Sequence, residues 1–257
     1  MSIRYKTKGL VFGKEDRLES DRIFYIFTSE FGRLKIFGKA IRKIKSKLRG
    51  GIDIFSVSEI EFIQGKSQKT LTDAVLVEKF NNILSSPKRF KTAQKLARIL
   101  DDFIKAEEKD ENLFNLLIDC LHKLNDDSLE SKDCDYIYYY FFWNFVSVLG
   151  YQPEVQKCAI CRQELNPIDI YFSNKEGGII CKKCLHLDAS AKKINSDVVK
   201  ILRLILKKDW HTISKLKIEP LSQELFKVIS DEHKRYIIPV RCSSFNSKNN
   251  IKYINRV

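Results

Sequence analysis

The chain has 257 residues, of which 44% are hydrophobic and 31% are charged, as is typical of an ordinary soluble globular protein. This length allows one large domain or two to three small ones. The 46 Lys and Arg residues exceed the 33 Asp and Glu residues, and the net charge of +13 points to a polyanionic partner. Nucleic acid is the first candidate and an anionic membrane surface the second. A lysine-rich surface without a partner is the alternative.

We expect neither an export signal nor a membrane span. Residues Met1 to Lys8 are polar, and no apolar stretch follows them. The longest apolar run, Tyr136 to Gly150, is too short to cross a bilayer and has Asn144 in its middle. The expected compartment is therefore the cytoplasm, where thiols stay reduced. In that compartment we expect three further cysteines to be reduced, with side chains partly buried in the protein: Cys120, Cys134 and Cys242.

The first eighty residues have strand character. Five segments are rich in β-branched and aromatic residues, and glycines lie between or beside them. These segments are residues 10–12, 22–28, 33–37, 52–62 and 71–77. Five short strands in this length predict a small barrel of the OB or SH3 type. Periodicity leaves the choice between the two open.

Positive charge is concentrated between residues 33 and 49, a segment with eight basic residues and no acidic one. The basic residues are Arg33, Lys35, Lys39, Arg42, Lys43, Lys45, Lys47 and Arg49. On strand and loop spacing such side chains can follow a phosphate backbone and release its counterions, which predicts a DNA-binding surface. A solvated loop is the alternative. Nearby aromatic residues such as Phe24 and Phe37 can stack on bases, although most of them are expected in the barrel core.

Helical periodicity replaces the strand pattern after residue 80. Ser86 and Pro87 predict the cap and first residue of a helix whose apolar stripe reaches Ile104. Further helices are expected over residues 111–124 and 133–149. The second of these is apolar nearly all round and belongs in the centre of a bundle, with its tyrosines in the core.

The C-terminal third adds two expected helices and most of the charge. Ser196 is expected to cap one helix, and the other runs from 221 to 235. The tail beyond Pro239 is rich in Ser, Asn and Lys and is expected to be partly disordered. Net charge is +7 over residues 1–80, −4 over 81–154 and +10 over 155–257, so polyanion binding is expected on the barrel and the C-terminal part.

Four cysteines have the spacing of a metal site. Cys158 and Cys161 form one Cys-x-x-Cys pair, and Cys181 and Cys184 form another after nineteen intervening residues. Two such pairs let four thiolates converge on one tetrahedral ion, and with no open position we expect structural zinc. Two disulfides, four unrelated thiols and an iron-sulfur cluster are the alternatives. His186 is a surface histidine in this interpretation, although it can replace a cysteine.

The sequence has no local motif of an enzyme. Acidic pairs such as Asp101 and Asp102 fit solvated helix faces or ends, and there is no glycine-rich phosphate loop. The four histidines are scattered: His122, His186, His211 and His233. We therefore expect no catalytic residues and no nucleotide binding.

Two blocks of the sequence resemble the RecO family of bacterial recombination mediators. The first block is similar to the family's OB-fold domain, and the second follows the order seen in its zinc-bearing members. The first comprises Glu19-Ser-Asp-Arg22, Phe27-Thr28 with Gly32, residues 38–46, Phe55 and residues 71–75. The second comprises residues 149–153, the first cysteine pair, Phe172-Ser173 and residues 177–184. Arg162, where the family usually has glycine, and Cys242-Ser-Ser-Phe245 depart from the pattern.

The resemblance implies an α+β multidomain fold. An N-terminal five-stranded OB-fold barrel is followed by an all-α helical domain with an inserted zinc ribbon held by four cysteines. The expected bounds are 1–80 for the OB-fold domain, 81–154 with 186–240 for the helical domain, 155–185 for the ribbon and 241–257 for a C-terminal tail.

The resemblance also implies a function in DNA repair. By this resemblance we expect a non-enzymatic, nucleoid-associated mediator that binds single- and double-stranded DNA and anneals complementary strands. With RecR it helps load RecA onto DNA coated by single-stranded DNA-binding protein (SSB), whose acidic tail docks on a basic and apolar patch of the helical domain. A zinc-ribbon RNA-binding or ribosome-associated module is the alternative, and a metal-dependent nuclease is the third hypothesis.

Overall fold

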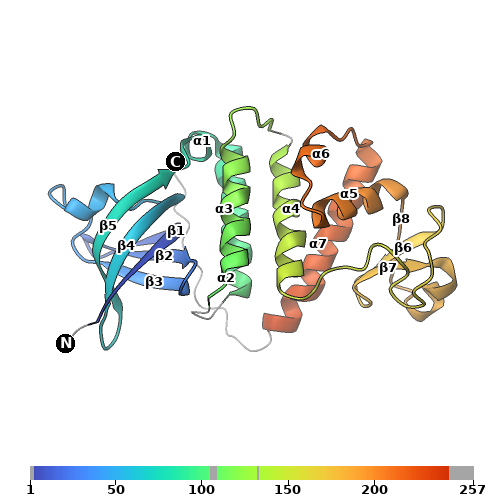
Figure 1. Cartoon of the computed structure of the whole chain (residues 1–257), viewed down its shortest axis with the longest axis horizontal. Coiled ribbons are helices and arrows are strands. Elements are labelled where there is room, and N and C mark those ends of the chain that lie inside the picture. Colours follow the sequence, from blue (N-terminus) through green and yellow to red (C-terminus); the bar gives the residue numbers. More distant parts are fainter. Residues whose placement is uncertain (1–2, 105–108, 132, 243–257) are drawn as a thin grey trace. The chain divides into compact units, whose positions relative to one another are not determined.

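A computed structural model describes residues 3–104, 109–131 and 133–242 of the chain (Figure 1). The chain divides into two compact units, one ending at Ile137 and the other beginning at Tyr138. The first unit contains a barrel and three helices, and the second contains helices and a small sheet. Among the described residues, no helix is both long enough and apolar enough to cross a membrane.

The first unit opens with a closed five-stranded barrel (Figure 1). Its strands are β1 (Arg4–Arg17), β2 (Asp21–Thr28), β3 (Gly32–Gly38), β4 (Ser56–Gln64) and β5 (Lys69–Lys79). The order around the barrel is β1-β2-β3-β5-β4, and every pairing is antiparallel except that of β3 with β5. A bulge between Val11 and Gly13 interrupts β1, which pairs with β4 in its first half and β2 in its second. The predicted OB-like barrel is confirmed.

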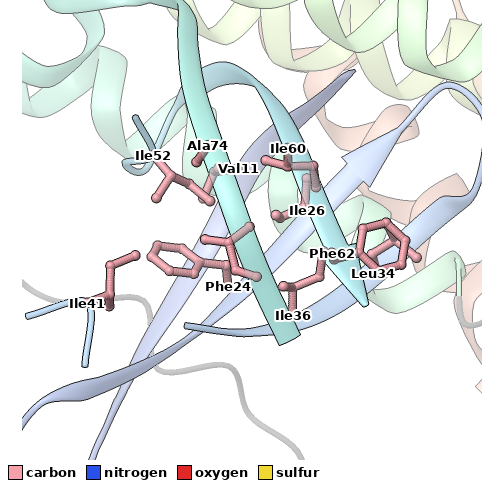
Figure 2. Close-up of a cluster of buried hydrophobic side chains, with 11 residues drawn as sticks. Val11, Phe24, Ile26, Leu34, Ile36, Ile41, Ile52, Ile60, Phe62 and Ala74 are labelled. Atoms are coloured by element: carbon pink, nitrogen blue, oxygen red, sulfur yellow. The ribbon is translucent and has the colours of Figure 1, made fainter. Parts of the chain in front are cut away.

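Apolar side chains fill the barrel (Figure 2). β3 buries alternate residues, Leu34 and Ile36 among them, whereas β2 is buried continuously over residues 23–28. The remaining members of the cluster are Val11, Phe24, Ile26, Ile41, Ile52, Ile60, Phe62, Leu71 and Ala74. Ile41 and Ile52 come from the connection between β3 and β4, so this long loop is partly built into the core.

Two strand predictions were wrong at their ends. The first strand was expected at residue 10 but begins at Arg4. Its start was missed because Arg4, Lys6 and Lys8 have low strand propensity. In the structure these three residues lie at exposed positions of the strand. The fourth strand was expected at residue 52 but begins at Ser56. The apolar residues before it are buried in a loop, and Phe55 has a positive φ of 50°, so their hydrophobicity reflects burial rather than strand formation.

Three helices complete the first unit: α1 (Asn81–Ser85), α2 (Pro87–Phe103) and α3 (Glu111–Asn125). The predicted cap is confirmed, since the Ser86 hydroxyl accepts a hydrogen bond from the Arg89 amide and Pro87 opens α2. Aromatic contacts fasten these helices to the barrel. The Phe90 and Phe55 rings meet edge-on at 5.4 Å, and the Phe114 and Phe27 rings lie 6.3 Å apart.

The long helix α4 (Asp133–Val148) carries the chain into the second unit. As predicted, it has almost no polar face: Tyr138, Tyr139 and Tyr140 are buried, and Trp143 is inaccessible to solvent. The other elements of this unit are β6 (Ile170–Ser173), β7 (Gly178–Cys181), β8 (Lys192–Ile194), α5 (Ser196–Leu206), α6 (Trp210–Lys215) and α7 (Pro220–Cys242). A 3-10 helix, η2 (Lys182–Leu187), follows β7.

The C-terminal helices correct several expectations. The cap of α5 is Asn195, whose side chain accepts from the Val198 amide, and not Ser196, which is the first helical residue. The sequence pattern did not indicate α6, and α7 is longer than the expected range of 221 to 235. Because α7 ends at Cys242, the expected tail starts as helix. The remainder of the tail and the side chain of Cys242 lie outside the described residues.

A buried histidine makes the stability of the second unit depend on pH. The His233 ring stacks on Trp143 at 4.8 Å, its Nδ1 lies 3.0 Å from the amide oxygen of Asn174, and burial lowers its pKa to about 4. The folded state thus favours the neutral ring. This contribution is complete above the unfolded pKa of roughly 6.5 and is lost as pH falls toward 4, by roughly 3 kcal/mol.

Comparing His233→Phe with the natural protein isolates this effect from carboxylates that titrate in the same range. The unfolding free energy of the natural protein, measured by urea titration, should fall more steeply between pH 6.5 and 4. Two parallel stability curves would show that His233 does not titrate in this way.

Candidate metal centre and nucleic-acid interface

The four cysteines lie at one end of the small sheet in the second unit. Its strands pair in the order β7-β6-β8, and the third strand, Lys192–Ile194, lies beyond residue 185, where the ribbon was expected to end. Cys158 and Cys161 occupy a tight turn closed by a 2.9 Å hydrogen bond from the Arg162 amide to the Cys158 carbonyl. Cys181 ends β7, and Cys184 lies in η2.

The positions of the sulfur atoms fit one tetrahedral ion. All four Sγ atoms lie within 4.8 Å of one another, and those of Cys161 and Cys181 are 3.8 Å apart. Zinc with four thiolates at about 2.3 Å requires sulfur-sulfur edges of about 3.8 Å. None of the four cysteines is in a disulfide, which removes one alternative. These residues can therefore hold a metal ion.

Backbone amides prepare one of the sulfurs for this role. Burial raises the pKa of the Cys158 thiol, but amide donors from Cys161, Cys181 and Ile160 outweigh it and lower that pKa to about 6. The Cys181 amide lies 3.4 Å from the Cys158 sulfur. The pKa of Cys184 rises to about 12 because its thiol is buried and close to the other three sulfurs. A cation would relieve this crowding of negative charge.

Two neighbouring residues behave as the sequence suggested. Arg162 has a positive φ of 61°, a conformation that glycine adopts more easily, so the first turn carries a backbone cost. Its guanidinium is largely exposed and pairs with Glu154 at 3.0 Å. His186 is exposed, and its Nδ1 lies 2.7 Å from the Lys183 carbonyl, outside the cysteine group.

The predicted basic residues lie on β3 and on the connection between β3 and β4, which we call the basic loop (residues 39–55) and which contains a short 3-10 helix, η1 (Lys47–Gly50). Six of them are exposed on this loop: Lys39, Arg42, Lys43, Lys45, Lys47 and Arg49. Among the described residues, only Arg42 of these six has a carboxylate partner, since its Nε lies 3.7 Å from Asp16. The loop thus presents a largely uncompensated positive surface on the first unit.

The other two predicted residues differ from these six. Lys35 is exposed on β3, with its Nζ 5.9 Å from the centre of the Tyr25 ring. The Arg33 side chain is only 22% exposed and forms an ion pair with Asp101 of α2. Arg33 therefore ties the barrel to a helix, and its charge is already balanced within the unit.

Hydrogen bonds hold the backbone of the basic loop at both ends, so its charged side chains project from a fixed backbone. The Ala40 amide donates to the Asp21 carboxylate at 2.7 Å, and the Arg42 amide donates to the Ser20 carbonyl at 2.9 Å. At the other end, the Phe55 amide donates to the Val11 carbonyl at 2.8 Å. The backbone of Gly51 lies so close to Ala74 of β5 that no side chain fits between them.

Two hollows on the barrel add residues that sequence reasoning missed. A hollow of about 300 Å³ is lined by three arginines, Arg22, Arg42 and Arg49, over an apolar floor. A second, of about 560 Å³, combines Arg17, Lys35 and Lys69 with the half-buried ring of Phe37. Arg17, Arg22 and Lys69 come from three strands, and no local run of charge in the sequence marked them.

Comparison with known proteins matches both halves of the chain to one family. The model for the recombination protein O N terminal matches residues 1–80, and the model for the recombination protein O C terminal matches residues 84–236. The chain belongs to the recombination protein O family. The resemblance inferred from the sequence is thus confirmed, and it places the chain among proteins of DNA repair and recombination.

Curated relatives in the family are similar over most of their length. A DNA repair protein RecO of Dehalococcoides mccartyi is 33% identical over 83% of each chain. Proteins of the same name from Alkaliphilus metalliredigens and Halalkalibacterium halodurans are 32% and 27% identical, over 91% and 89% of this chain and 92% and 88% of their own.

Proposed function

We propose that the protein is a non-enzymatic recombination mediator that binds single- and double-stranded DNA and anneals complementary strands. The observation that carries this proposal is the uncompensated basic loop on an OB-like barrel. Two DNA strands repel each other through their phosphates, and a protein that neutralises both backbones lowers this repulsion. The contacts are expected to be independent of sequence, because lysine and arginine on a loop meet phosphates rather than base edges.

The binding path we propose runs from the basic loop onto the barrel face. In the three-arginine hollow, Arg22 and Arg42 both pair with Asp16, at 2.7 and 3.7 Å, so Arg49 is the guanidinium we propose for a phosphate group, which it can bind through two parallel hydrogen bonds. The second hollow offers Phe37 for stacking of a base, with Lys35 in its lining for the backbone. Arg33 is left out of this path because it pairs with Asp101.

Zinc is the metal we propose for the four cysteines. A closed set of four thiolates favours a structural zinc ion that stabilises the ribbon without activating water. Such an ion would be held by Cys158, Cys161, Cys181 and Cys184, and its contribution would be to folding. An iron-sulfur cluster would colour the purified protein, so its absorbance spectrum separates the two metals.

The proposal also includes protein partners. The mediator binds RecR, and together they help load RecA onto single-stranded DNA coated by SSB. For the acidic tail of SSB we propose a groove of about 460 Å³ in the first unit. Apolar side chains of Leu84, Pro87 and Phe90 form part of its wall, and Lys91, Lys95 and Arg98 lie along α2 beside them. Apolar floor and basic rim complement a peptide that ends in acidic and aromatic residues.

The central experiment is annealing of two complementary oligonucleotides, naked or coated with SSB, without ATP and at two salt concentrations. The natural protein should accelerate both reactions, and the acceleration should weaken as salt rises. Replacing Lys43, Lys45 and Lys47 with Ala should slow both annealing reactions and weaken binding of a single DNA strand. The slope of log binding constant against log salt concentration should become smaller in magnitude by about 2. Lys91→Glu should slow only the reaction on coated strands.

A matched control removes three other exposed lysines of the barrel, Lys6, Lys8 and Lys79. The control should leave the salt slope unchanged. An unchanged slope in the basic-loop variant would refute the binding surface. If the natural protein binds structured RNA more tightly than single strands and accelerates no annealing, the RNA-binding alternative replaces the proposal.

A further inference from the structure

A second basic surface lies on the second unit, along α5 and α6. Between Val198 and Ile218 the chain has six Lys and Arg residues and one acidic residue, Asp209. Five lysines are exposed there, and we call them the α5–α6 lysine surface: Lys200, Lys207, Lys208, Lys215 and Lys217. In the part of the chain that the structure describes, none of the five has an ion pair with a carboxylate.

The carboxylates of this segment are occupied within the fold. Asp209 caps α6, where it accepts from the Thr212 amide at 3.0 Å and from the Thr212 hydroxyl at 2.7 Å. Asp197, one turn before the lysines, accepts from the buried hydroxyl of Ser222 at 3.2 Å. Acidic groups that are fixed by short-range hydrogen bonds are not free to move toward the lysines. The positive charge of the surface is therefore left for an external partner.

The helix geometry separates the lysines from the apolar contacts of α5. Val198, Ile201, Leu202 and Ile205 are buried on one face. Lys200 and Lys207 are seven residues apart, which is about two helical turns, so they project from the same opposite face. Arg203 between them turns inward and donates to the Val155 carbonyl at 2.9 Å, and it is not part of the surface.

We propose that the α5–α6 lysine surface binds the phosphate backbone of a second DNA strand while the basic loop holds the first. This inference rests on the proposed function, because annealing requires two strands on one protein. A strand of phosphates is the partner that best fits extended, flexible lysines. Each compact unit would then carry one strand site.

The test measures how many short DNA strands each protein chain binds. With oligonucleotides of about ten nucleotides, titration should show two bound strands per natural chain. Replacing Lys200, Lys207 and Lys217 with Ala should leave one, with an unchanged affinity for that strand, and should slow annealing by roughly tenfold or more. The basic-loop variant should also bind one strand, at the remaining site.

A charge-matched control replaces Lys175, Lys182 and Lys193, which are exposed but paired with Glu176 or Asp169. This variant should still bind two strands. The inference is overturned if the natural protein saturates at one strand, if the lysine-surface variant still binds two, or if that surface captures only an acidic peptide or anionic vesicle. Loss of function in the basic-loop variant alone would keep the proposed function and reject the second site.

Discussion

Replacing Cys158 with Ser is expected to empty the metal site and unfold the ribbon. The metal content should fall from one ion per chain to nearly none, because a serine hydroxyl is a poor ligand and three thiolates leave the tetrahedron open. Metal binding supplies folding free energy at such sites, so the surrounding sheet should lose its order as well. Elemental analysis measures the ion, and hydrogen exchange of β6, β7 and β8 measures the order.

The comparison variant is His186→Ala, which changes an exposed residue close to the cysteines but outside their group. It should keep a full metal content and normal exchange. Exchange in the barrel should be unaffected in both variants, because the barrel belongs to the other compact unit. If the natural protein is purified without metal and its ribbon is still protected from exchange, the metal centre does not exist.

Gly51→Ala is expected to destabilise the barrel by about 3 kcal/mol or more. The added Cβ would lie 1.8 Å from the backbone oxygen of Ala74 and 2.5 Å from its carbonyl carbon, so the loop or β5 has to move. The effect is purely steric, since the φ of Gly51 is −86° and suits any residue. Because the displaced backbone carries Lys47 and Arg49, DNA binding should weaken in the same variant.

The adjacent Gly50 offers a matched control, because a Cβ added there meets no atom within 4 Å. Urea unfolding of Gly50→Ala should differ from that of the natural protein by less than about 0.5 kcal/mol. Equal stabilities of the Gly50 and Gly51 variants would mean that the loop does not lie against β5 as described.

Features that depend on residues close together in the chain could be predicted from the sequence. The pairs at Cys158 and Cys181 and the cap at Ser86 need only a few residues each, and the structure places all of them in the expected arrangement. The same holds for α4, whose lack of a polar face required a buried position.

Features that depend on distant residues could not be predicted. Arg33 lies in a run of basic residues but pairs with Asp101, which is 68 residues away. The hollow of three arginines forms because Arg22 of β2 and two residues of the basic loop, Arg42 and Arg49, line the same depression. Neither pairing has a signature in local spacing. The division of the chain near Tyr138 is similarly set by helices that pack on the barrel rather than by a change of composition.

The topology of the closed barrel determines the order in which its strand pairings form during folding. The three strands β1, β2 and β3 are consecutive neighbours, and β4 and β5 form a hairpin, so both groups can assemble from local contacts. They are joined by the long-range pairing of β1 with β4 and by only two residue pairs between β3 and β5. The basic loop is the chain that connects the two groups. A newly made protein therefore completes the proposed DNA-binding surface last, when the slow, long-range contacts have formed.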